Sequence, residues 1–227
     1  MLRTILLAKN MNAQIHDLLR RLTQQNGQEI TSSVDSVSFN AHREAEKIAD
    51  EAILSKAKAA VVHEKDKKKR DSLYYVIGKV ALNLSHSDTS DFLIQQIKRE
   101  TDKYVLGALL DRIADLPKPK GTDLQPILDH LEDSRCLVRH SAIQALKQTF
   151  SHDAELALMG LLERATDPYD ITYANATLNQ IGSLRSVPTI ERHLSSRKRD
   201  VKLSAQLAIQ AIRKRQEGRQ DGTSNGG

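Results

Sequence analysis

The 227-residue chain has no tryptophan, one cysteine, ten glycines and five prolines. Glycine and proline together make up about 7% of the residues, against about 12% in an average protein. Since these two residues interrupt regular structure, their scarcity favours long helices. The single cysteine, Cys136, excludes an internal disulfide and a thiolate metal cluster, and it fits a reducing compartment.

Long hydrophobic runs are also missing. No apolar segment approaches the roughly 18 residues that a membrane-spanning helix needs, and the first residues are not followed by a small-residue cleavage site. We therefore expect no membrane insertion and a cytoplasmic protein. With 39% hydrophobic residues, the chain can still form one or two ordinary domains.

The formal net charge is +5, and the excess is concentrated in two segments. Basic clusters bind phosphate backbones by releasing counterions, whereas a solvated loop or helix end is the ordinary alternative. Single-strand binders add aromatic stacking platforms, and only 4% of this chain is aromatic. Nucleic-acid binding is thus an alternative function, with contacts expected from Lys67, Lys68, Lys69, Arg70, Arg197, Lys198, Arg199 and Lys202.

Five stretches of the chain repeat one apolar pattern. They start at Leu73, Val105, Val138, Asp170 and Val201, and successive starts differ by 32, 33, 32 and 31 residues. Within each stretch, the first residue and those 4, 7 or 8, and 11 positions later are mostly apolar, which places one apolar stripe on a helix. So regular a period indicates a repeat architecture.

Each of these helices has a shorter helical partner before it. Segments starting at Asp91, Leu124, Leu156 and Val187 precede four of the helices, and a helix over Ala41–Val62 precedes the first. Asp and Ser in the connections can accept hydrogen bonds from the free N–H groups of the next helix. The sequence therefore predicts an all-α superhelix of about four to five helix pairs, stacked so that each pair covers the apolar stripe of the next.

The two ends of the chain follow other patterns. Residues 1–22 predict an amphipathic helix that packs on the first pair, with a membrane-seeking helix as the alternative, and residues 26–38 read as a polar linker. From Gln216 onward no apolar residue anchors the chain, and we expect disorder. The expected organisation is an N-terminal helix and linker over 1–40, a solenoid over 41–215, and a disordered tail over 216–227.

Two segments carry a resemblance to a known family. The stretch NQIGSLRSVPTIERHL (Asn179–Leu194) and the stretch VRHSAIQAL (Val138–Leu146) resemble HEAT repeats, in particular the short, phycobilin-lyase-like variety. The sequence departs from that pattern in the fourth unit, where Asp170 and Ile171 stand at its Val-Arg positions, and Ile-Gly is intact only at Ile181–Gly182.

The resemblance covers about Asp71 to Arg215 and implies a HEAT-like α-solenoid with a binding surface. Its enzymatic relatives, phycobilin lyases and repeat-built DNA glycosylases, give a second alternative function. The glycosylases use characteristic tryptophans, which this chain lacks. Eight scattered histidines form no metal-ligand pattern, and no nucleophile or phosphate-binding motif occurs. We expect no catalysis, no metal, no cofactor and no small-molecule substrate.

The main hypothesis is a scaffold or adaptor that binds a protein partner through the concave face of the solenoid. Short repeat proteins of this kind resemble adaptors and immunity proteins, which implies inhibition of the partner as one mode of action. Positions of the second helices that avoid the core give the expected contact residues, namely Tyr75, Lys79, Asp111, His140, Gln144, Tyr173 and Gln180. Arg139 is expected instead to bond a carboxylate of the neighbouring unit.

Overall fold

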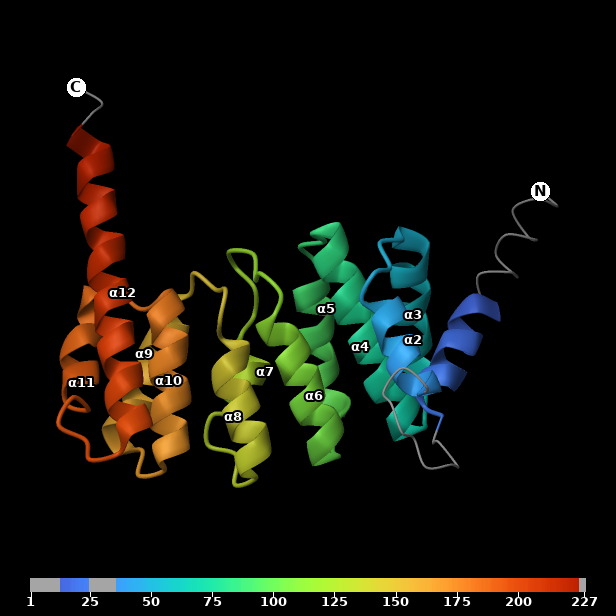
Figure 1. The fold of residues 1–227 in the computed structure, drawn as a ribbon, viewed down its shortest axis with the longest axis horizontal. Helices are drawn as coiled ribbons and strands as arrows, with labels where there is room; N and C mark the ends of the chain where they lie inside the picture. Colours follow the sequence, from blue (N-terminus) through green and yellow to red (C-terminus); the bar gives the residue numbers. More distant parts are fainter. Residues whose placement is uncertain (1–12, 25–35, 225–227) are drawn as a thin grey trace.

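The computed structural model describes residues 13–24 and 36–224, with side chains as far as Gly218. Helices stand side by side in one row along the molecule, with the helix over residues 13–22 and the helix α12 at opposite ends of that row (Figure 1). After a helix over residues 13–22, the elements are α2 Val37–Ala45, α3 Glu51–His63, α4 Lys67–Leu84, α5 Thr89–Gln96, η2 Ile97–Arg99, α6 Lys103–Ala114, α7 Gln125–Leu128, α8 Cys136–Ala145, α9 His152–Arg164, α10 Pro168–Ile181, η3 Leu184–Ser186, α11 Val187–Glu191 and α12 Arg199–Ser224.

The row is built from five helix pairs, as the repeat predicts. The pairs are α3 with α4, α5 with α6, α7 with α8, α9 with α10, and α11 with α12. The second helix of each pair packs on the second helix of the next, from α4 through α6, α8 and α10 to α12. The chain is therefore an all-α solenoid in which each pair contacts its neighbours.

Aspartates begin most of the second helices. Side-chain oxygens of Asp66, Asp102 and Asp167 accept hydrogen bonds from backbone N–H groups in the first turns of α4, α6 and α10. Two second helices begin differently. Helix α8 starts after Arg135 without a side-chain cap, and Asp200 lies inside the first turn of α12.

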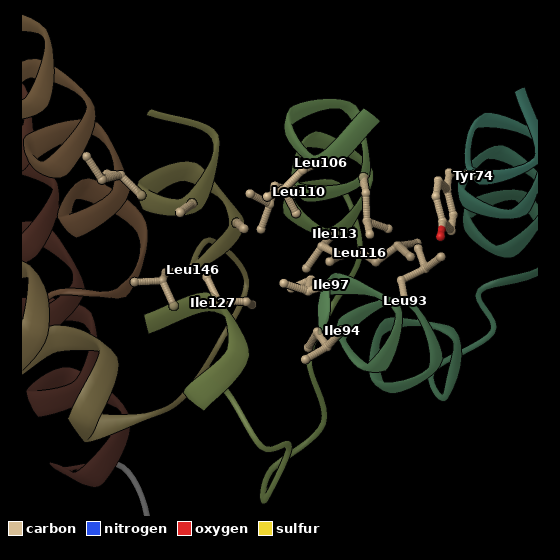
Figure 2. Packing of buried hydrophobic residues seen from close by; sticks show 14 of the residues in the cluster. Tyr74, Leu93, Ile94, Ile97, Leu106, Leu110, Ile113, Leu116, Ile127 and Leu146 are labelled. Atoms are coloured by element: carbon tan, nitrogen blue, oxygen red, sulfur yellow. The ribbon is translucent and has the colours of Figure 1, made fainter. Parts of the chain in front are cut away.

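The apolar stripes meet in one continuous core between the two layers of helices. Side chains of α4, α5, α6 and α7, among them Leu93, Leu110 and Ile127, point toward one another across the pair boundaries (Figure 2). The first stripe residue is buried in all five helices, with exposed fractions of 1, 4, 0, 6 and 2% for Leu73, Val105, Val138, Asp170 and Val201. The spacing of the stripes thus identified the core.

The segment Ala41–Val62 is not the single helix that we expect from its propensity. It divides into the end of α2 and most of α3, and the chain turns between Ala45 and Glu51. Asn83 of α4 donates hydrogen bonds of 2.8 Å to the carbonyls of Glu46 and Ile48 in this turn. The break is therefore held by a side chain that lies more than thirty residues away in the sequence. The expected pairing with α4 is nevertheless confirmed, because α3 packs on it.

The ends also differ from the expectation. Helix α12 spans Arg199–Ser224, so it extends past Gln216, from which we expect a disordered tail. Residues 37 and 38, expected in the linker, belong to α2. At the other end, Ile15, Leu18, Leu19 and Leu22 of the helix over 13–22 are buried in the core, while 1–12 and 25–35 lie outside the described residues.

Candidate protein-binding surface

The five second helices share one face that carries the junctions between neighbouring pairs. It contains the seven residues predicted to bind a partner. It also contains the residues just before the apolar stripes of α6, α8 and α10, which are Tyr104, Leu137 and Tyr169. We call this face the second-helix surface. The structure places the predicted residues in three junction groups, and Gln180 stands apart, exposed near the end of α10.

Tyr75 and Lys79 lie together at the junction of α4 and α6. The Tyr75 hydroxyl donates a hydrogen bond of 3.1 Å to Oε1 of Glu46, and its ring lies 4.8 Å from that of His42. The cations of Lys79 and Arg112 lie 5.9 and 5.6 Å from the ring centroid. Burial and the bond to Glu46 raise the pKa of Tyr75 to about 12. Tyr75 therefore joins three helices and is only half exposed to a partner.

Asp111 and Gln144 lie at the next junction, between α6 and α8. Asp111 accepts a hydrogen bond from Ser141, and burial raises the pKa of its carboxyl group. Gln144 accepts a bond of 3.1 Å from the Lys147 ammonium. Both predicted residues already have partners within the protein.

His140 and Tyr173 lie together between α8 and α10, with ring centroids 5.0 Å apart. Arg139 beside them donates from Nε to both oxygens of Asp170, at 2.9 and 2.8 Å, and from Nη2 to Asp167 at 3.3 Å. The expectation that Arg139 bonds a carboxylate of the neighbouring unit is confirmed. This bond also explains how Asp170 replaces an apolar residue at a buried stripe position.

One group of potential metal ligands occurs at this same junction. Atoms of His140, Asp167 and Asp170 lie within 4.8 Å of one another. Nε2 of His140 is 3.0 Å from Asp170, although the two do not form a well-directed hydrogen bond. The guanidinium of Arg139 already occupies both carboxylates. The Arg139 guanidinium is therefore the cation of this cluster, and its bonds to Asp167 and Asp170 connect α8 to α10.

The most exposed apolar side chains of this surface were missed by the sequence analysis. Tyr104, Leu137 and Tyr169 are 65, 40 and 65% exposed, and each immediately precedes the apolar stripe of its helix. Leu137 packs over Gly107, where an added Cβ would come within 3.3 Å of it, and the Tyr169 ring lies 6.0 Å from that of His140. Their equal spacing in the repeat was the available signal.

The same face continues onto the last helix, where Leu203 and Leu207 of α12 are 44 and 49% exposed. The second-helix surface therefore presents exposed apolar side chains on four consecutive second helices, α6, α8, α10 and α12.

The two basic segments differ in how they are paired. In the first, Lys67 bonds Asp102 at 2.8 Å, and Arg70 donates to both oxygens of Glu100 at 2.8 and 3.0 Å. Lys68 and Lys69 are exposed. In the second segment, Arg197, Lys198, Arg199 and Lys202 are all exposed, and none forms an ion pair with the described carboxylates.

Comparisons with known proteins agree with this architecture. No protein-family model and no curated protein sequence matches the chain. Among solved structures, one described as "Designed armadillo repeat protein YIII(Dq)4CqI" is 16% identical with a TM-score of 0.55, covering 86% of this chain and 98% of its own.

A second solved structure, an engineered protein that was Northeast Structural Genomics Consortium target OR329, is 16% identical with a TM-score of 0.56 and covers 88% of this chain and 97% of its own. These similarities define the class as an α-solenoid of helical repeats. They support the repeat architecture and do not single out the HEAT family. Across residues 13–24 and 36–224, no helix combines the length and apolarity needed to span a bilayer.

Proposed function

We propose that the protein is a non-catalytic scaffold that binds a protein partner through the second-helix surface. The observation that supports this most is the row of Tyr104, Leu137 and Tyr169, which is exposed at equivalent positions of three consecutive pairs. Large apolar side chains on a rigid, partly charged surface are the usual anchors of protein interfaces. Repeat solenoids are also widely used as binding scaffolds.

The charges around this row favour a protein over a nucleic acid. Lys103 lies beside Tyr104 with its ammonium 5.0 Å from the ring centroid, while Asp102 and Asp167 cap the same helix ends. Asp102 is paired with Lys67 and Asp167 with Arg139, so the anchors stand among paired charges of both signs rather than in a patch of unpaired cations. A folded protein surface can match such mixed charge.

The scaffold acts by occupying a surface of its partner. When that surface includes the partner's own functional site, binding inhibits the partner; otherwise the solenoid works as an adaptor. Both modes use the same anchors, so the anchors can be tested before the mode is known.

The test is affinity capture from the native host with three forms of the protein. The double variant Tyr104→Ala, Tyr169→Ala removes two anchors with high exposure, so the fold should persist. We expect recovery of the partner to fall about tenfold or more, since interface anchors each contribute about 2 kcal/mol. Leu156→Ala with Leu184→Ala is the matched control, because these residues are 43 and 49% exposed on other elements. Equal recovery with all three forms would contradict the proposal.

A further inference from the structure

The C-terminal end of the row is a second surface of interest. Figure 1 shows α11 and α12 as the last described elements of the row, with no helix beyond them. Every other second helix is covered by the following one, since α4 packs on α6, α6 on α8, α8 on α10 and α10 on α12. The face of α12 that corresponds to these covered faces is open.

The repeat register identifies which α12 residues form this face. Asn175 and Asn179 of α10 donate to Ser204 at 3.2 Å and to the Leu207 carbonyl at 3.0 Å, across the junction with α12. Gln206 and Gln210 of α12 stand 31 residues later, at equivalent positions. Both line an open hollow of about 680 Å³. The hollow therefore lies where a further helix would stack.

The repeat register also shows that this face lacks the carboxylates that basic side chains bond at the internal junctions. Arg139 bonds carboxylates of the following pair, and Lys202 occupies its position two repeats later. Arg70 likewise bonds Glu100 of the following pair, and Lys198 occupies its position four repeats later. Neither Lys202 nor Lys198 has a carboxylate partner among the described residues, in which α12 is the last helix.

The hollow itself has an apolar floor and a largely basic rim. Leu194 and Ile209 contribute apolar atoms, and the cations are Lys202, Lys214 and Arg213, of which Arg213 pairs with Glu191 at 2.9 Å. The one carboxylate of the lining is Glu217. A partner that fits must bring an apolar stripe together with negative charge.

We propose that the α11–α12 end face binds an acidic amphipathic helix of a protein partner, in the place where a sixth helix pair would stack. A helix is the occupant because a helix fills the equivalent position at every internal junction. Its carboxylates replace those that Glu100, Asp167 and Asp170 supply inside the protein, and its apolar stripe covers Ile209. This surface lies outside the row of Tyr104, Leu137 and Tyr169 and goes beyond the function proposed above.

A second copy of the chain fits this face less well. The opposite end of the row is covered by the helix over 13–22, and there Asp17 and Glu44 are already paired with Arg20 and Arg21. The hollow at that end is lined by His16, Lys56 and Lys69, among others. Stacking the two ends would therefore bring basic groups together.

The experiment selects helices from a displayed peptide library against the full chain. The library fixes leucines at i, i+3, i+4 and i+7 of a helix of about 20 residues and varies the flanking positions among Glu, Gln and Lys. We expect glutamate to be enriched over lysine in the selected peptides. Enrichment of lysine, or no preference, would overturn the proposal.

Three variants locate the site of the selected peptide. Charge reversal with Lys202→Glu, Lys214→Glu should weaken binding about tenfold or more, and Gln206→Trp should do the same by filling the hollow without changing its charge. The control Lys68→Glu, Lys98→Glu makes the same change of net charge on α4 and η2 and should bind like the wild type. Thermal unfolding followed by circular dichroism checks that each variant is folded.

The remaining outcomes count against the proposal. Binding that survives Gln206→Trp would show that the peptide does not enter the hollow. An oligonucleotide that binds more tightly than the best peptide, and is insensitive to Gln206→Trp, would assign the surface to nucleic acid. If the wild type self-associates and the variants at the hollow do not, the α11–α12 end face binds a second copy of the chain instead. The Tyr104→Ala, Tyr169→Ala form should keep the selected peptide, so this proposal and the preceding one can fail separately.

Discussion

The two basic segments, Lys65–Arg70 and Arg197–Lys202, accompany the starts of equivalent helices at opposite ends of the row. In the first, Glu100 and Asp102 of the following pair neutralise Arg70 and Lys67. In the second, the cations face solvent. The composition of the two segments is similar, and the difference arises because a further pair packs after the first segment, whereas the second lies on the last described pair.

This comparison shows how a solenoid uses charge. At internal junctions, a basic side chain on one second helix meets acids on the turn into the next, so sequence separations of 28 to 35 residues become short ion pairs. At the terminal pair the same basic positions remain free. Charge that stabilises stacking inside the row therefore becomes available for a partner at its end.

We expect the largest effect on stability from breaking the ion pair between Arg70 of the first basic segment and Glu100. Glu100 is 1% exposed at its side chain and accepts hydrogen bonds from Arg70 and from the Tyr74 hydroxyl at 2.7 Å. Glu100→Ala removes the carboxylate that the part-buried Arg70 guanidinium and the Tyr74 hydroxyl share, and we expect the free energy of unfolding to fall by about 3–5 kcal/mol. Urea denaturation measures it. Asp102→Asn removes a solvent-exposed pair while keeping the helix cap, and should change stability little; equal effects of the two variants would refute the distinction.

Lys118 extends the comparison between paired and solvent-exposed basic side chains, because it is buried and no carboxylate bonds it. Its Nζ donates to the carbonyls of Ile113 and Lys147, each at 2.6 Å, and burial lowers its pKa to about 7 from the usual 10.5. Between these values the unfolded chain binds more protons than the folded one. Stability should therefore rise with pH across this window, by up to about 1.4 kcal/mol per pH unit.

The Lys118→Met variant tests the assignment of this pH dependence. Denaturation midpoints measured from about pH 7 to pH 9 should rise in the wild type and lose most of that rise in the variant. Below about pH 7 the lysine is protonated in both folded and unfolded chains, so its contribution becomes constant. A variant with the wild-type slope would show that another group is responsible.

The smallest expected effect concerns binding of polyanions rather than stability. Retention on heparin over a salt series should have a log-log slope that falls by about one for each phosphate-like contact removed. We expect Lys198→Ala with Lys202→Ala to lower the slope by up to about two. Lys67→Ala should change it little, since Asp102 already neutralises Lys67 at the surface. A larger fall in slope for the variant of the first segment than for that of the second would contradict the ion pairs seen in the structure.

The helix pairs could be predicted because apolar spacing is a local property of the chain. The stripe that starts at Val138, for example, fixes which face of α8 is buried whatever helix covers it. The break between α2 and α3 could not be predicted in this way, because the turn there is stabilised by hydrogen bonds from Asn83, which lies on α4. The bonds of Arg215 on α12 have the same character, since its guanidinium donates to the carbonyls of Asn179 and Gly182, which lie more than thirty residues earlier in the sequence.

The candidate surface was predicted in part. The repeat register gave the correct type of partner for Arg139. It did not separate Tyr75 and Tyr173, which pack against histidines, from Tyr104 and Tyr169, which are largely exposed. The shared position of Tyr104 and Tyr169 before the stripe was a signal in the sequence, but how far the neighbouring helix covers each ring was not.

By itself the sequence determined the class of fold and the buried stripes and limited the number of pairs to about four or five, because helix periodicity and the repeat length are local properties of the chain. Only the tertiary structure decided which charges are neutralised and which aromatic rings remain available. Those outcomes depend on whether side chains about one repeat apart meet across a junction between neighbouring pairs.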